Sequence, residues 1–141
     1  MRNAFALSAA LALLTSVAAA APALTAQDAW VRAVPGADSA AAYLTLHNGG
    51  TAAVVIDGVR SGSAAHAMIH ETTLSNGVSG MRPHEPLTVA PGATVRLAPG
   101  GMHIMLSTLV HPLTPGERVA LTLLLAGGGT LEVSALVRPL T

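Results

Sequence analysis

Cysteine is absent from this sequence of 141 residues, and its absence excludes a whole class of metal site. Without a thiolate, the chain cannot build a blue-copper or purple-copper centre or a Cys-x-x-Cys carrier. Disulfides are excluded as a source of stability as well. In an oxidising compartment a thiol tends to become a disulfide, so a metal carrier that works there is better served by Met and His.

Lysine is also absent, and charge of either sign is sparse. The seven positively charged residues are all arginines, and seven Asp and Glu balance them. Without Arg2, which lies in the N-terminal segment described below, six arginines face seven carboxylates and the formal charge is −1. A near-neutral chain with no basic run is a poor partner for nucleic acid or for an anionic membrane surface.

Long hydrophobic runs are missing too. A transmembrane helix takes about 20 apolar residues, whereas the apolar run over residues 4–14 has the length of a secretory hydrophobic region. Arg2 precedes it, and the alanines at 18–20 fit a small-residue cleavage site. We therefore expect a signal peptide over residues 1–20 and a periplasmic or otherwise extracytoplasmic mature protein; an uncleaved anchor is the alternative. Residues 21–141 suffice for a single domain with a hydrophobic core.

Helical periodicity with capping residues is missing from the mature sequence, although residues 37–42 would tolerate a helical turn. Turn signals such as Pro91-Gly92 and Pro115-Gly116 instead recur about every ten residues. The stretches between them alternate apolar and polar residues, as in 131–137, where every second residue is apolar. Short alternating strands between such turns predict an antiparallel β-sandwich or barrel. The strands are expected to cover Trp30, Tyr43, His70, His103, Leu123 and Val133.

Four residues that are present form the most informative pattern in the chain. His70, Met81, His103 and Met105 read as His, ten residues, Met, twenty-one residues, His, one residue, Met. Imidazole and thioether together suit few ions, because thioether sulfur is soft and favours low-valent copper over zinc, magnesium or calcium. The pattern predicts a copper site with two nitrogen and two sulfur ligands.

Strand geometry explains the spacing. Residues two apart in a strand point to the same face, so His103 and Met105 present a nitrogen and a sulfur side by side. Asn76-Gly77 favours a tight hairpin that brings Met81 back toward the strand of His70. Ile104 and Leu106 would take the opposite face, so we expect an apolar core face and an exposed face of His and Met.

Other potential donors are less strongly indicated. Met68 shares a strand face with His70 and could add or replace a sulfur ligand. Met102 should face away from His103 and pack inside, as methionine commonly does. The remaining histidines are expected to lie at the surface outside the site: His47, His66, His84 and His111.

At these residues the chain resembles the PCuAC-type periplasmic copper chaperones, whose signature is the same spacing of His and Met. The resemblance extends over most of the mature chain. It includes 29–33, 41–46, 70–73, 76–78, 81–83 and 100–106. The family often has a Met directly after the first His, and here that position is Glu71, so any ligand supplied there is absent.

The resemblance implies a cupredoxin-like, antiparallel Greek-key β-sandwich that binds Cu(I) near its surface. By residue-to-residue match, His70, Met81, His103 and Met105 become the copper ligands. The family is linked to delivery of copper to the binuclear site of a cytochrome c oxidase subunit, often alongside a thiol-containing copper chaperone. We expect a monomer that acts on such an acceptor and is not an enzyme.

Three other functions are weighed against this one. A copper-buffering or resistance protein would carry the same site. An enzyme is disfavoured because the chain has no Gly-rich phosphate loop, nucleophile elbow or His-Glu-x-x-His motif. A metal-free interaction module would leave the register of His and Met unexplained.

Overall fold

The computed structural model describes residues 8–14 and 23–140, which form ten strands and, within those ranges, no helix. Each of the six residues expected on strands lies on one, so the all-β prediction is confirmed, and β2 begins at Ser39 in the segment that would have tolerated a helical turn. The predicted signal peptide falls largely on residues 1–7 and 15–22, outside the described part. The strands are β1 (Leu24–Arg32), β2 (Ser39–Asn48), β3 (Val54–Arg60), β4 (Ala64–Ser75), β5 (Val78–Pro83), β6 (Leu87–Val89), β7 (Thr94–Leu97), β8 (Met102–Leu109), β9 (Arg118–Leu125) and β10 (Thr130–Arg138).

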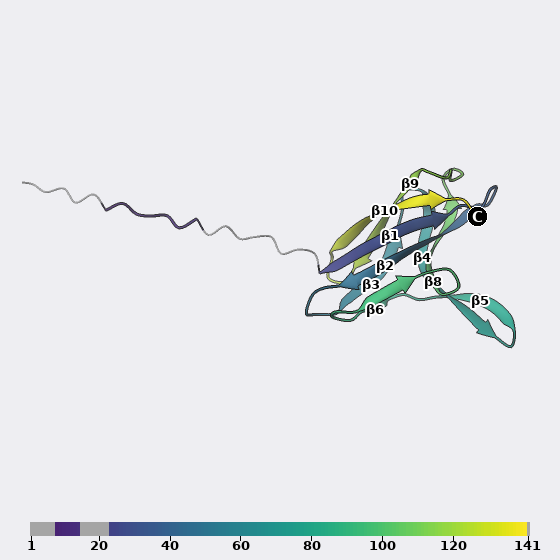
Figure 1. Ribbon diagram of the computed structural model, residues 1–141, viewed down its shortest axis with the longest axis horizontal. Coiled ribbons are helices and arrows are strands. Elements are labelled where there is room, and N and C mark those ends of the chain that lie inside the picture. The colour runs from purple at the N-terminus through teal and green to yellow at the C-terminus, as the bar shows by residue number, and fades with distance from the viewer. Residues whose placement is uncertain (1–7, 15–22, 141) are drawn as a thin grey trace, which may run out of the picture.

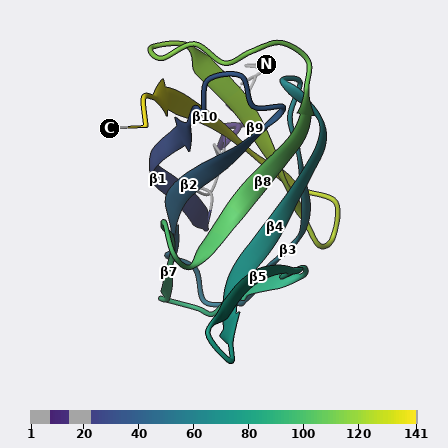
Figure 2. The ribbon, with the colours of Figure 1, turned by 90° about the vertical axis from the view of Figure 1, so that its right-hand side faces the viewer.

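The strands pair in the order β5-β4-β8-β2-β1-β10-β9-β3-β6, with β7 also paired to β2. The sheet folds over itself, so that β1, β2, β8 and β4 form one layer and β9 and β10 pass behind them (Figure 2). Strand β2 pairs with β8 through its first half and with β7 through its second half. One pair departs from the antiparallel expectation, because β1 and β10 run parallel over Trp30–Arg32. These two strands are not joined by a turn, so no hairpin constrains their relative direction.

The core lies between the two layers and is built by the alternation seen in the sequence. On β8, Ile104 and Leu106 are 1% and 0% exposed, as their predicted inward face requires. Ala135 and Val137 are buried on β10, whereas Leu131 and Val133 are partly buried against the same core. Burial of each large aliphatic side chain contributes about 1.5–3 kcal/mol, and it is this packing that stabilises a chain without disulfides.

The β4–β5 hairpin projects from the body of the molecule (Figure 1). Ser75 pairs with Val78, so Asn76 and Gly77 form a two-residue turn with φ angles of 51° and 76°. Positive φ at both positions is the reversed turn that Asn-Gly favours, which confirms the predicted hairpin. Every residue of β5 is exposed. Strand β5 is therefore held mainly by its backbone pairing with β4.

A bulge in β1 changes which side chains reach the outer face of the sheet. The register shifts between Gln27 and Trp30, and Asp28 has a φ of 54°. Leu24 before the bulge and Val31 after it are both buried, although they are an odd number of residues apart. The extra residue reverses the alternation, as bulges do. It consequently places Trp30 on the outer face.

Candidate metal centre

Three of the four predicted ligands, His70, His103 and Met105, meet Met68 through the pairing of β4 and β8. The register sets His70 opposite His103 and Met68 opposite Met105. Directly opposed residues of an antiparallel pair share a face, so two imidazoles and two thioethers occupy neighbouring positions on one side of the sheet. The two imidazole centroids are 5.9 Å apart with the rings nearly perpendicular.

Met81 approaches from the other side of β4. The hairpin register sets it opposite Thr72, so it lies diagonally from His70 on the same face. Diagonal neighbours are about 7–8 Å apart, within reach of a long side chain. Strand β4 continues five residues past His70, to Ser75. The turn thus returns Met81 two residues short of the position directly opposite His70.

Within the described part of the chain, one ring nitrogen of each histidine is buried and has no hydrogen-bond partner. His103 Nδ1 lies 3.3 Å from the Gly101 carbonyl oxygen, which can only accept, so Nδ1 carries the hydrogen and Nε2 bears the lone pair in the neutral ring. Among the described residues, only His103 Nε2 and His70 Nδ1 are buried side-chain nitrogen or oxygen atoms without a hydrogen-bond partner. Buried polar atoms are normally paired. Two unpaired nitrogens beside methionine sulfurs fit a soft metal ion, and the Gly101 contact is the kind that orients a ligating imidazole.

The electrostatics of the site favour the neutral form of His103. Burial lowers the pKa of His103; the Gly101 hydrogen bond opposes this shift, and nearby His70 adds to it. Glu71 pairs instead with His84 at 3.1 Å and Arg82 at 3.0 Å, and these contacts, the His84 hydrogen bond above all, hold the Glu71 pKa below its usual value. Within the described ranges no three His, Cys, Asp or Glu side chains cluster to hold a metal ion. A metal site here therefore depends on thioether sulfur.

The expectation of an exposed His and Met face is only partly correct. His103 is on the outer face but only 4% exposed, whereas Met68 and Met81 are 39% and 58% exposed. The ring of Tyr43, with its centroid 6.5 Å from that of His103, and the ring of His70 flank this imidazole. The nitrogen of His103 thus lies deep, and two of the sulfurs lie toward solvent.

The other histidines and Met102 lie outside this cluster. Met102 packs against the core, as predicted. His66 is opposite Ser107 on the outer face, two paired positions beyond His70. His84, His47 and His111 make contacts elsewhere, with Glu71, Thr94 and the Pro112 carbonyl respectively.

Tyr43 is a neighbour of the site that sequence reasoning did not identify. The sequence pattern around Tyr43 predicts a strand. It cannot predict that this strand, β2, lies beside β8, because that pairing joins segments distant in the sequence.

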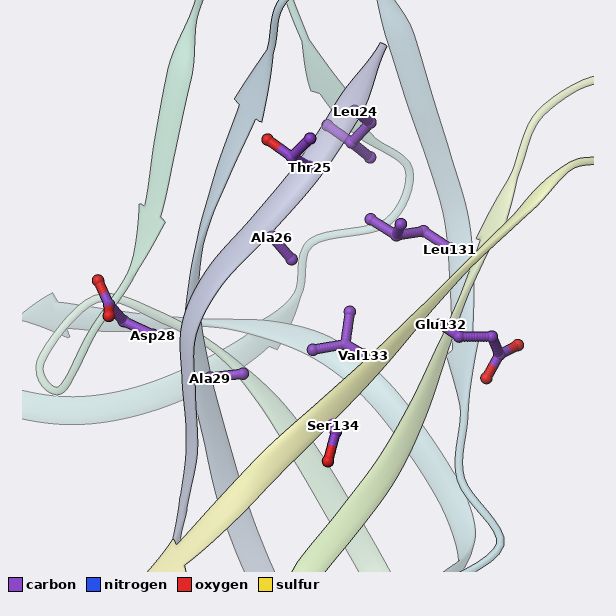
Figure 3. A pocket seen from close by; sticks show the side chains of 9 residues that line it. All are labelled: Leu24, Thr25, Ala26, Asp28, Ala29, Leu131, Glu132, Val133 and Ser134. Atoms are coloured by element: carbon purple, nitrogen blue, oxygen red, sulfur yellow. The ribbon is translucent and has the colours of Figure 1, made fainter. Parts of the chain in front are cut away.

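A cavity of about 350 Å³ lies elsewhere, between β1 and β10 (Figure 3). It forms because these strands pair only over Trp30–Arg32 and diverge before that point. Ala26, Ala29 and Val133 point into it, and neither His nor Met lines it. The cavity therefore offers no soft donors for a metal. A bare ion held on a sheet face needs no cavity of this size.

Comparison with known proteins finds a family and a relative that this chain resembles in sequence. Residues 24–137 match the family described as "Putative lipoprotein LpqE-like". The "Putative lipoprotein Lxx21020" of Leifsonia xyli subsp. xyli (strain CTCB07) is 35% identical over 111 residues, which are 78% of this chain. The match covers 66% of that relative, just under two thirds of its length. No helix among the described residues is long and apolar enough to cross a membrane.

Solved structures share the fold. The solution structure of CuI-DR1885 from Deinococcus radiodurans is 37% identical, with a TM-score of 0.68 over 84% of this chain and 80% of that one. A copper-bound PCuAC domain from PmoF2 has a TM-score of 0.70 over 86% of this chain and 97% of that one, at 21% identity, a likeness of fold alone. The expected cupredoxin-like β-sandwich is thereby confirmed.

Proposed function

Since this chain belongs to the LpqE-like family and has the PCuAC type of fold, we propose that it is an exported copper chaperone whose cargo is Cu(I). The observation that carries the proposal is the pair of buried, unpartnered nitrogens, His70 Nδ1 and His103 Nε2, beside methionine sulfurs on one sheet face. Neutral nitrogen and thioether donors suit a soft, singly charged ion.

The ligands we propose are His70, Met81, His103 and Met105. Support comes from the shared face of these residues and from the 37% identical protein whose structure was solved with Cu(I). Met68 makes a fifth donor within the same cluster, directly opposite Met105. We assign it as an additional sulfur that can supplement the four ligands or replace one of the two methionines among them.

Delivery to another protein is favoured over storage by the placement of the donors. Two sulfurs are substantially exposed, so an acceptor can reach the ion without unfolding the chaperone. The acceptor proposed from the family resemblance is the copper site of a cytochrome c oxidase subunit, with a thiol-containing copper chaperone as a further partner. The setting is periplasmic or otherwise extracytoplasmic. Copper buffering is the second candidate, since the same site would serve it.

Anaerobic titration tests the cargo. We expect one Cu(I) per chain, with nitrogen and sulfur neighbours in X-ray absorption. Ag(I), a soft and redox-silent mimic, should compete, and Zn(II) should not. Buffering replaces delivery if the loaded protein never passes copper to a soluble oxidase copper-site domain.

Substitution of the sulfur ligands tests the site. Met81→Ala and Met105→Ala should each weaken Cu(I) binding about tenfold or more, a loss of about 1.4 kcal/mol or more. Met102→Ala is the matched control: it should lower stability and leave affinity nearly unchanged, because its side chain packs against the core. The Met68→Ala/Met81→Ala double variant should lose more than Met81→Ala alone. The assignment is wrong if Met81→Ala and Met105→Ala bind Cu(I) as tightly as the parent.

A further inference from the structure

The outer face that carries the metal donors continues across β2 and β1 to β10. One row of paired residues runs from Met105 through Ala41 and Arg32 to Arg138. In the neighbouring row, Trp30 is paired with Tyr43, whose ring lies next to that of His103. The donors therefore form one end of a larger surface, and we call Trp30, Arg32, Tyr43 and Arg138 the arginine–aromatic face.

Cation–π contacts order this face. The Arg32 guanidinium carbon lies 5.8 Å from the centre of the Trp30 ring and 5.7 Å from that of Tyr43. The Arg138 guanidinium carbon lies 5.1 Å from the centre of Trp30. A guanidinium stacked on an aromatic ring keeps N–H donors at its edge, in the planar fork that matches a carboxylate.

Among the residues that the structure describes, neither Arg32 nor Arg138 has a carboxylate within 4.0 Å. Arg32 and Arg138 are direct cross-strand partners, a placement of like charges that costs stability. In the ranges that the structure describes, the one arginine–carboxylate pair within 4.0 Å is that of Arg82 with Glu71. Asp28 lines a groove of about 530 Å³ beside Trp30 and Arg138 but does not pair with either arginine.

We propose that the arginine–aromatic face is the docking surface for a carboxylate-bearing surface of the protein that receives the copper. The inference rests on the proposed function, because it assigns a partner to that same site. Bidentate pairing of Arg32 and Arg138 with carboxylates would relieve their mutual repulsion. It would also hold the partner over the donors at the other end of the face. A nucleic acid or an anionic membrane is disfavoured, since the sequence has no lysine and residues 21–141 carry a formal charge of −1.

Trp30 provides a direct readout, because it is the single tryptophan of the chain and contacts both arginines. The full chain is titrated with a hexaglutamate peptide at low ionic strength while Trp30 fluorescence is followed. We expect a saturable change that disappears at about 1 M salt, where the screening length is about 3 Å. Hexaglutamine should produce no change. The proposal is overturned if hexaglutamate gives no saturable change, or if phosphatidylglycerol vesicles bind more tightly than the peptide.

Paired variants separate docking from copper binding. Arg32→Gln/Arg138→Gln should lower the apparent affinity for hexaglutamate about tenfold or more, which corresponds to about 1.4 kcal/mol or more. Arg60→Gln, at an exposed position at the end of β3, should not change that affinity. An unchanged response of the double variant overturns the proposal. Cu(I) affinity, measured in parallel, should be equal in all three proteins; an absence of Cu(I) binding in the parent would refute the chaperone function and leave the peptide result standing.

Discussion

At the scale of single residues, the two nitrogens of His103 have separate roles. Nδ1 donates to the Gly101 carbonyl and fixes the ring, while Nε2 is buried with no partner. An imidazole held in this way is neutral and correctly oriented before an ion arrives. The spacing of His and Met in the sequence predicted the residue but could not reveal which nitrogen is free, because that depends on a carbonyl at the start of β8.

Acidification should weaken copper binding at His103. Burial lowers the pKa of His103, so the ring is neutral near pH 7 and protonation of Nε2 competes with Cu(I) only as the pH falls through that lowered value. Unperturbed imidazole titrates near pH 6.5 and thioethers do not titrate, so we expect affinity to be constant above about pH 7 and to fall below about pH 6. Competition with a Cu(I) chelator at each pH measures this affinity.

His84→Gln serves as the control for this dependence, because His84 pairs with Glu71 outside the site. The variant should follow the same curve as the parent. Constant affinity down to about pH 5 would show that sulfur dominates and that the histidines are not ligands.

At the scale of strands and turns, much could be predicted from local pattern. Alternation located the strands, and Asn76-Gly77 located the hairpin, because both features depend on neighbouring residues only. Register was not accessible in this way. That Met81 lies opposite Thr72, and that Met68 lies opposite Met105, follows from the lengths and pairing of strands that are distant in the sequence.

The β4–β5 turn should control affinity through Met81. Gly77 and Gly36 have the same φ, 76°, and an added Cβ would meet nothing within 4 Å at either position. Alanine at each should therefore introduce only backbone strain, about 1–2 kcal/mol. We expect Gly77→Ala to weaken Cu(I) binding about fivefold or more, since roughly 1 kcal/mol is then needed to bring Met81 into place. Gly36→Ala, in the turn before β2, should leave affinity unchanged.

The measurements for this pair are Cu(I) affinity and amide hydrogen exchange in β5. Faster exchange in β5 should accompany the loss of affinity in Gly77→Ala alone. Equal affinities for the two variants would argue that Met81 is not a ligand.

At the scale of the whole molecule, the side chains that stabilise the core and those proposed to bind copper lie on opposite faces of β8. Ile104 is 1% exposed in the core, between His103 and Met105. Ile104→Ala should lower the free energy of unfolding by about 2–5 kcal/mol through lost burial and a residual cavity. Met105→Ala should cost about 1 kcal/mol or less, because its side chain is on the outer face. Denaturant unfolding of the metal-free proteins measures both, and equal losses would contradict the separation of the two faces.

Closure of the two layers was the part of the structure least accessible from sequence. The parallel pairing of β1 with β10 joins the two ends of the domain, and no local motif encodes it. Asn48 is a further example: as part of Asn48-Gly49-Gly50 it signals a turn, yet it is fully buried. Its amide donates to the carbonyls of Ala52 and Val89 and so connects the end of β2 to the loop before β3 and to the end of β6. Such a role depends on which segments meet in space.

The opposed pairs of β4 and β8 also make cargo binding a check on correct folding. A slip of one residue between these strands would turn every side chain of one strand to the wrong face, bringing Ile104 outward and His103 into the core. Under the proposed ligand assignment, a misregistered chain would have no site to fill. Copper loading would then mark the correctly folded molecules, and a defective copy would be screened out of the delivery route before it met an acceptor.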